Sequence, residues 1–126
     1  MIKRFGSGGP YEDAIGYSRV VQTGSLSLTA GCTAVVDGEL QHVGDAYHQA
    51  IVAFGVGLDA LAAAGCPPEN VVSSRMYVAR RSDIDAVARA HSAVFDKIRP
   101  TSALILVAGF VDERMLVEIE LVGAAP

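Results

Sequence analysis

Residues 70–108 read NVVSSRMYVARRSDIDAVARAHSAVFDKIRPTSALILVA, and their pattern predicts a strand, a helix and a second strand in succession. Apolar and polar residues alternate over 70–79, which predicts a strand. Ser82 and the two aspartates that follow it are typical of a helix start, because acidic groups in the first turn favour the helix dipole. That helix must end before Pro100, and the apolar run at 101–108 predicts a second strand.

The same rules apply on both sides of this unit. Apolar residues repeat on one helical face over 45–64, and Gly65 then supplies the end of that helix. Short strands are expected at 17–21, 25–29, 32–36 and 115–122, after a loop at 6–16 that is rich in Gly and Pro. The order β-β-β-α-β-α-β-β predicts one α+β domain over 1–126, a mixed sheet with both helices packed on one face.

Composition excludes several classes of protein. The formal net charge is −4, and the 10 Lys and Arg residues are scattered, whereas a nucleic-acid-binding protein needs a basic face. No apolar run approaches the roughly 20 residues that span a bilayer, and because no apolar stretch follows residues 1–5 we expect no signal peptide. We therefore expect a cytoplasmic protein with neither nucleic acid nor membrane as a partner. Because 51% of the residues are apolar, we also expect part of the surface to face another subunit.

Charged residues inside apolar strands are the first candidates for a site. Glu118 and Glu120 share one face of the last expected strand, and Arg75 lies in the middle of the strand at 70–79. One interpretation is a solvated face with a structural Arg75–Glu pair. The other is a partly buried carboxylate acting as general acid or base, with Arg75 binding an anionic ligand.

His91 lies on the apolar stripe of the second expected helix, where it is either a core residue with one hydrogen bond or a catalytic group. His42 and His48 have no ligand spacing, and Cys32 and Cys66 are too few for a zinc site, so we expect no metal. Nothing in the sequence implies a cofactor.

Five segments along nearly the whole chain share one resemblance. They are Tyr17-Ser18-Arg19-Val20-Val21, Leu28-Thr29-Ala30-Gly31, Val71-Val72-Ser73-Ser74-Arg75-Met76-Tyr77-Val78, Arg99-Pro100-Thr101-Ser102 and Val117-Glu118-Ile119-Glu120. In this order they resemble the reactive intermediate deaminase family (Rid, YjgF/UK114-type, also called endoribonuclease L-PSP). The resemblance implies a chorismate-mutase-like fold that assembles as a homotrimer around a central barrel, with small-molecule sites in the clefts between subunits.

The resemblance also implies site residues. In deaminating members a tyrosine and a glycine backbone near the N-terminus form the pocket, and a glutamate on the last strand positions the attacking water. These residues match Tyr17, Gly31 and Glu120. The arginine that binds the substrate carboxylate in those members is replaced here by Ser102.

Without that arginine, the resemblance implies a branch whose activity differs from standard 2-imino acid deamination. Arg75 and His91, together with Ser102 and Glu118, are the candidates to line a different polar pocket. Two functions stay open: hydrolysis of an imine, an enamine or a related reactive metabolite, or a metabolite-binding trimer without catalysis. Some family members are ribonucleases, but the acidic charge balance argues against that activity here.

Overall fold

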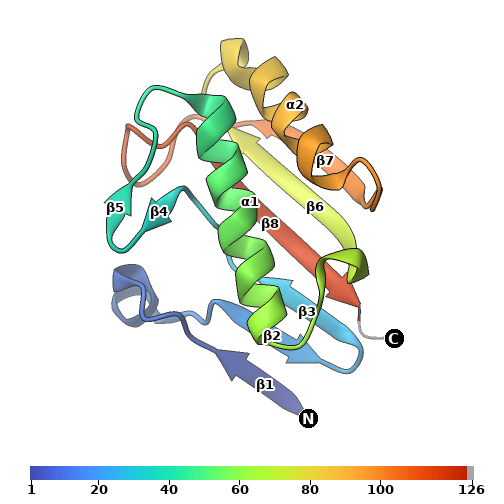
Figure 1. Ribbon diagram of the computed structural model, residues 1–126. Helices are drawn as coiled ribbons and strands as arrows, with labels where there is room; N and C mark the ends of the chain where they lie inside the picture. The colour runs from blue at the N-terminus through green and yellow to red at the C-terminus, as the bar shows by residue number, and fades with distance from the viewer. Residues whose placement is uncertain (125–126) are drawn as a thin grey trace.

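The computed structural model describes residues 1–124 and contains the expected strand–helix–strand unit. Strand β6 (Val71–Val78) leads through a short 3-10 turn at Arg81–Asp83 into α2 (Ile84–Phe95), and β7 (Thr101–Leu106) follows. β6 and β7 pair in parallel, with Ser74 opposite Ser102. The helix connects them across one face of the sheet (Figure 1).

The remaining large strands complete a six-stranded sheet in the order β1-β2-β3-β8-β6-β7. β8 (Val117–Ala124) is antiparallel to both of its neighbours, β6 and β3 (Leu26–Thr29). β2 (Val20–Thr23) pairs with β3 in the expected hairpin, and β1 (Ile2–Phe5) adds an edge strand that the sequence did not indicate.

Helix α1 (Ala46–Ala63) has the expected limits, since the Asp45 side chain caps its N-terminus and Gly65, with a φ of 87°, follows its last turn. By length and composition alone this helix could cross a membrane, contrary to the expectation from the sequence. In the structure Phe54 and its neighbours on the same face are fully buried in the core, which is the packing of a core helix. A 3-10 turn at Pro68–Asn70 connects α1 to β6.

Residues 32–36 differ most from their predicted strand. Only Val35–Val36 form a strand, β4, which pairs with β5 (Glu39–Leu40) in a small separate hairpin. Asp37 and Gly38 both have positive φ angles, as a two-residue hairpin turn requires. Cys32 instead bridges to Ile119 of β8 and holds the chain against the central strand.

Both helices lie over the same face of the sheet (Figure 1). The core fills the space between the helices and this face. Its largest buried side chains are Phe54 and Leu61 from α1, Phe95 from α2, and Ile119 and Leu121 from β8. Because side chains alternate along β8, Glu118 and Glu120 point to the opposite face. Within residues 1–124 no helix covers that face.

The open face of the sheet also carries large apolar side chains. The strand registers place Leu26, Leu28 and Ile105 on it, because Leu28 lies opposite Val122, Leu26 opposite Ala124 and Ile105 opposite Tyr77. These three side chains are 42%, 40% and 40% exposed. An apolar sheet face of this kind is typical of a surface that another chain covers.

Candidate functional site

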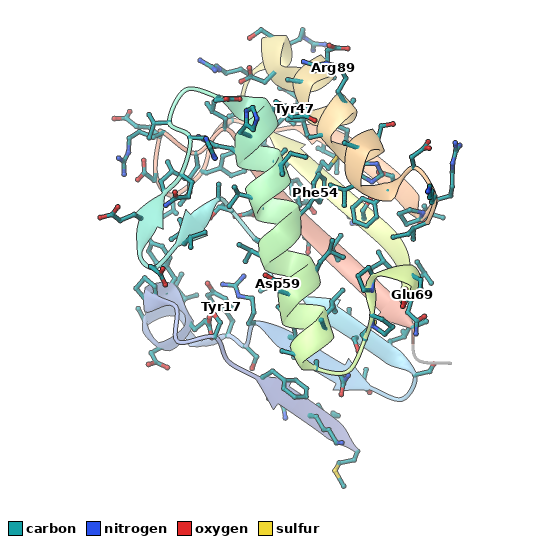
Figure 2. The ribbon with its side chains drawn as sticks, in the orientation of Figure 1. Tyr17, Tyr47, Phe54, Asp59, Glu69 and Arg89 are labelled. Carbon is teal, nitrogen blue, oxygen red and sulfur yellow. The ribbon has the colours of Figure 1, made fainter. Side chains whose placement is uncertain are left out.

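A pocket of about 900 Å³ lies between the N-terminal loop, the β4–β5 turn and β8. Its lining comes from the loop, the segment around β3, α1, the segment before β8 and β8 itself: Ser7, Gly8, Gly9, Pro10, Tyr11, Ile15, Tyr17, Arg19, Ala30, Gly31, Thr33, Val35, Asp37, Gly38, Val56, Val111, Met115 and Glu118. In Figure 2, Tyr17 lies beside the N-terminal turn at Glu12–Gly16. The pocket therefore brings together residues from both ends of the chain.

Glu118 is the carboxylate on the central strand that lines this pocket, and it is half-buried. Gly31 makes room for it: a Cβ on Gly31 would lie 2.8 Å from Glu118 Cδ, closer than carbon atoms can pack. Burial raises the pKa of Glu118, the nearby Glu120 carboxylate adds to the rise, and the positive charge of Arg19 opposes it. Among the residues described, no side chain or backbone group hydrogen-bonds to the Glu118 carboxylate, and none forms an ion pair with it.

Arg19 is the cation of the pocket, and most of its donors are used inside the chain. Its Nη1 donates to the Gly31 carbonyl at 2.7 Å and lies 3.5 Å from Cys32 Sγ. Its Nη2 lies 3.5 Å from the Tyr17 hydroxyl, and its Nε lies 3.6 Å from Glu12 Oε2. Arg19 thus fixes the position of Gly31 and Tyr17 around Glu118.

Glu12 holds the N-terminal loop that forms one wall of the pocket. Its carboxylate accepts hydrogen bonds from the backbone N–H of Ser7 at 2.9 Å, the Ser7 hydroxyl, and the backbone N–H of Gly9 at 3.3 Å. Burial alone would raise the pKa of Glu12, but the Ser7 hydrogen bonds and the charge of Arg19 outweigh it, so the pKa is lowered. The loop expected at 6–16 is only partly correct, because Glu12–Gly16 form a π-helical turn. The whole segment is tied to Arg19 through one buried carboxylate.

Of the residues predicted from the sequence, the structure gathers Tyr17, Gly31 and Glu118 in the pocket. Glu120 lies outside its lining, and its carboxylate accepts a hydrogen bond from the Tyr77 hydroxyl, which raises the pKa of Tyr77. Arg75 lies opposite Glu120 in the sheet register, which is the position that an Arg75–Glu pair would need. Its side chain is exposed, however, and none of the ion pairs within residues 1–124 includes it.

His91 and Ser102 lie on the helix-covered face, in a second cluster apart from the pocket. His91 Nε2 is 2.7 Å from the buried Ser74 hydroxyl, which in turn lies 3.1 Å from Ser102 Oγ. The His91 ring packs against Phe54 and Phe95, and burial lowers its pKa. His91 is partly buried at the edge of the core and has one hydrogen bond to a side chain, which is the geometry of the first of the two alternatives that the sequence left open.

Arg19 is the pocket residue that the sequence analysis did not single out. It lies at a bend just before β2, and its guanidinium contacts the Tyr17 hydroxyl and ring. A charge inside a strand predicted at 17–21 was a signal of the same kind as the one that drew attention to Arg75. No group of three or more His, Cys, Asp or Glu side chains within residues 1–124 is placed to hold a metal ion.

Comparisons with known proteins agree with this architecture. The family model for endoribonuclease L-PSP matches residues 11–125. An uncharacterized protein of Streptomyces coelicolor is 41% identical over 119 residues, which cover 94% of this chain and 89% of that protein.

Solved structures show the same fold. The crystal structure of Rv2704 from Mycobacterium tuberculosis, a member of the YjgF/YER057c/UK114 family, is 33% identical, with a TM-score of 0.88 over 99% of this chain and 100% of that chain. E. coli TdcF with bound serine has a TM-score of 0.81 at 22% identity, over 98% of this chain and 94% of that chain, and shows the fold alone. The chain belongs to the endoribonuclease L-PSP family, which includes the YjgF/YER057c/UK114 proteins.

Proposed function

We propose that this pocket binds a small molecule with a C=N bond and hydrolyses that bond, with Glu118 as the general base. One observation carries the proposal: Glu118 is a half-buried carboxylate that faces the pocket without a partner among the described residues. A raised pKa makes a carboxylate a stronger base, which suits it to accept a proton from water. This role was expected for Glu120, but Glu120 is engaged with Tyr77 outside the pocket.

The reaction uses water alone as the second reactant. Glu118 takes a proton from water while the water oxygen attacks the carbon of the protonated imine, and the electron pair of the C=N bond moves to the nitrogen, which gives a neutral carbinolamine. The proton held by Glu118 then goes to the amine nitrogen, the C–N bond breaks, and ammonia leaves while the carbinol hydroxyl gives its proton to Glu118 and its oxygen becomes the carbonyl. Ammonia takes this last proton, so the products are an aldehyde or ketone and ammonium, and Glu118 ends as a carboxylate.

Tyr17 would orient the substrate in this scheme. Arg19 Nη2 points at the phenol oxygen from 3.5 Å, so the hydroxyl hydrogen of Tyr17 remains available to donate to a ligand. Binding of a small polar molecule suits this fold, since TdcF, a protein of the same fold, contains bound serine.

We further propose that the chain assembles as the homotrimer that the family resemblance implies, with the open sheet face turned toward neighbouring copies. Three apolar side chains on that face support this proposal: Leu26, Leu28 and Ile105 are each at least 40% exposed. When a second chain covers such side chains, the removal of apolar surface from water lowers the free energy of the assembly. Sedimentation equilibrium at micromolar concentration is expected to give a trimer mass, and a stable monomer would refute it.

The hydrolase proposal is tested with imines generated in situ by an amine oxidase, following the release of ammonia. Glu118→Gln should lower the enzyme-catalysed rate by about 10²–10⁴-fold, the usual contribution of a general base. Glu69→Gln is the matched control, because Glu69 is exposed, lies outside the pocket lining and carries the same charge. Ligand binding without release of ammonia above the buffer rate would instead establish a binding protein without catalysis.

A further inference from the structure

We infer that this pocket selects small molecules that present an N–H donor or a protonated nitrogen to Glu118 and that carry no carboxylate. This inference rests on the proposed function and names its substrate class: a carboxylate-free imine, bound as its protonated iminium. It differs from the 2-imino acids that deaminating members of the family take.

The first argument is that the pocket offers an unused acceptor. The Glu118 carboxylate has no hydrogen-bond donor among the described residues, although it is half-buried. Among the described residues no buried side-chain oxygen lacks a partner, so the Glu118 carboxylate is in contact with solvent. A ligand that fills the pocket displaces this water, and it must donate a hydrogen bond to Glu118 in its place to avoid leaving a charge without a partner. A protonated nitrogen satisfies this acceptor best, because hydrogen bonds between opposite charges are the strong ones.

The second argument is that the pocket offers no free cation for an anionic ligand. Among its lining residues Arg19 is the one positively charged side chain, against the carboxylates of Glu118 and Asp37. Three hydrogen-bond contacts of Arg19 go to Gly31, Cys32 and Tyr17, and its Nε faces Glu12. A guanidinium has five N–H groups, and these contacts within residues 1–124 leave a single N–H of Nη2 without a neighbour. One N–H group cannot make the bidentate contact that carboxylates prefer.

The third argument concerns the rest of the pocket wall. Apolar side chains make up much of the remaining pocket wall, with Val35, Val56 and Met115 among them. A compact apolar body with one nitrogen therefore matches the wall and the acceptor together.

The test compares three probes with the same ring and different charge: cyclopentylamine, cyclopentanol and cyclopentanecarboxylate. Their dissociation constants are measured at pH 7 by NMR titration of the intact protein. The amine should bind tighter than the carboxylate by roughly tenfold or more, the value of one charge-assisted hydrogen bond. Glu118→Gln should remove this preference, while Glu69→Gln, which makes the same change in net charge, should leave it intact.

Tighter binding of the carboxylate, an amine preference that survives Glu118→Gln, or no binding of any probe would overturn the inference. The outcomes separate it from the proposed function. An amine preference without imine hydrolysis refutes the hydrolase and leaves the ligand class standing. Rapid hydrolysis of 2-iminopropionate together with tight carboxylate binding refutes the ligand class and leaves the hydrolase standing.

Discussion

Gly55 and Gly57 lie two residues apart in α1 and meet different surroundings. A Cβ on Gly55 would have no atom outside its own helix within 4 Å, whereas a Cβ on Gly57 would lie 3.0 Å from Leu121 Cδ1 and 3.2 Å from Ile119 Cδ1. Both of those β8 side chains are fully buried, so neither can move away freely. The two substitutions to alanine therefore test how closely the helix approaches the sheet.

Alanine is favoured over glycine in a helix interior by about 1 kcal/mol, and both variants receive this gain. At Gly57 the added methyl group also overpacks the core, which typically costs about 1–3 kcal/mol. Gly55→Ala should thus raise the free energy of unfolding by about 1 kcal/mol. Gly57→Ala should change it by between about zero and −2 kcal/mol.

Urea unfolding at one protein concentration measures both values, since an oligomer's stability depends on concentration. For a chain of this size each kcal/mol corresponds to roughly 3–6 °C in Tm, so a thermal melt also resolves the difference. If Gly57→Ala proves as stable as Gly55→Ala, the close packing of α1 on β8 described above is wrong.

Three further predictions concern the pocket and the titrating side chains. Gly31→Ala places a methyl group 2.8 Å from Glu118 Cδ, so it should turn the carboxylate away and weaken amine binding at least tenfold by NMR titration, with little change in Tm; undiminished binding contradicts the pocket geometry. The pKa of Glu12 in the folded chain lies below the ordinary value of 4.5, so its stabilising contribution is present above pH 4.5 and is lost as the pH falls through the folded pKa. In urea melts between pH 3 and 6, the free energy of unfolding should therefore depend less on pH in Glu12→Gln than in the parent chain. Burial lowers the pKa of His91 from 6.5, so the unfolded chain binds a proton that the folded chain does not, and stability should fall as the pH drops below 6.5; the same slope in His91→Gln would assign it to another group.

Local sequence signals predicted the regular elements well. The β6–α2–β7 unit and α1 follow from alternation and apolar periodicity, which depend on residues close together in the chain. Asp45 caps α1, whereas the helix start expected at Ser82 is wrong: a 3-10 turn occupies Arg81–Asp83, and α2 begins at Ile84 without a side-chain cap. Strand β1 and the shortened β4 were not predicted, because both depend on distant partners. Phe5 pairs with Val20, and Cys32 is drawn from the predicted strand to Ile119.

The site was predictable only in part, for a similar reason. Glu118 and Glu120 share one face of β8, so the pattern alone cannot decide which of them meets the N-terminal segment. The choice depends on where the chain leaves β3, since Gly31 then lies against Glu118. The contacts of Arg19 with Gly31 and Glu12 likewise join segments whose approach the sequence does not reveal.

The position of β8 in the sheet has a consequence for synthesis on the ribosome. β8 is the last of the described strands to be made, yet it lies between β3 and β6 and provides the hydrogen-bonded ladder between the two halves of the sheet. Until it emerges, the β1–β3 meander and the β6–α2–β7 unit each expose an unpaired strand edge, the kind of surface that chaperones protect in a nascent chain. The pocket also lacks Glu118 until then, so the capacity to bind a ligand arises in the same step that completes the sheet.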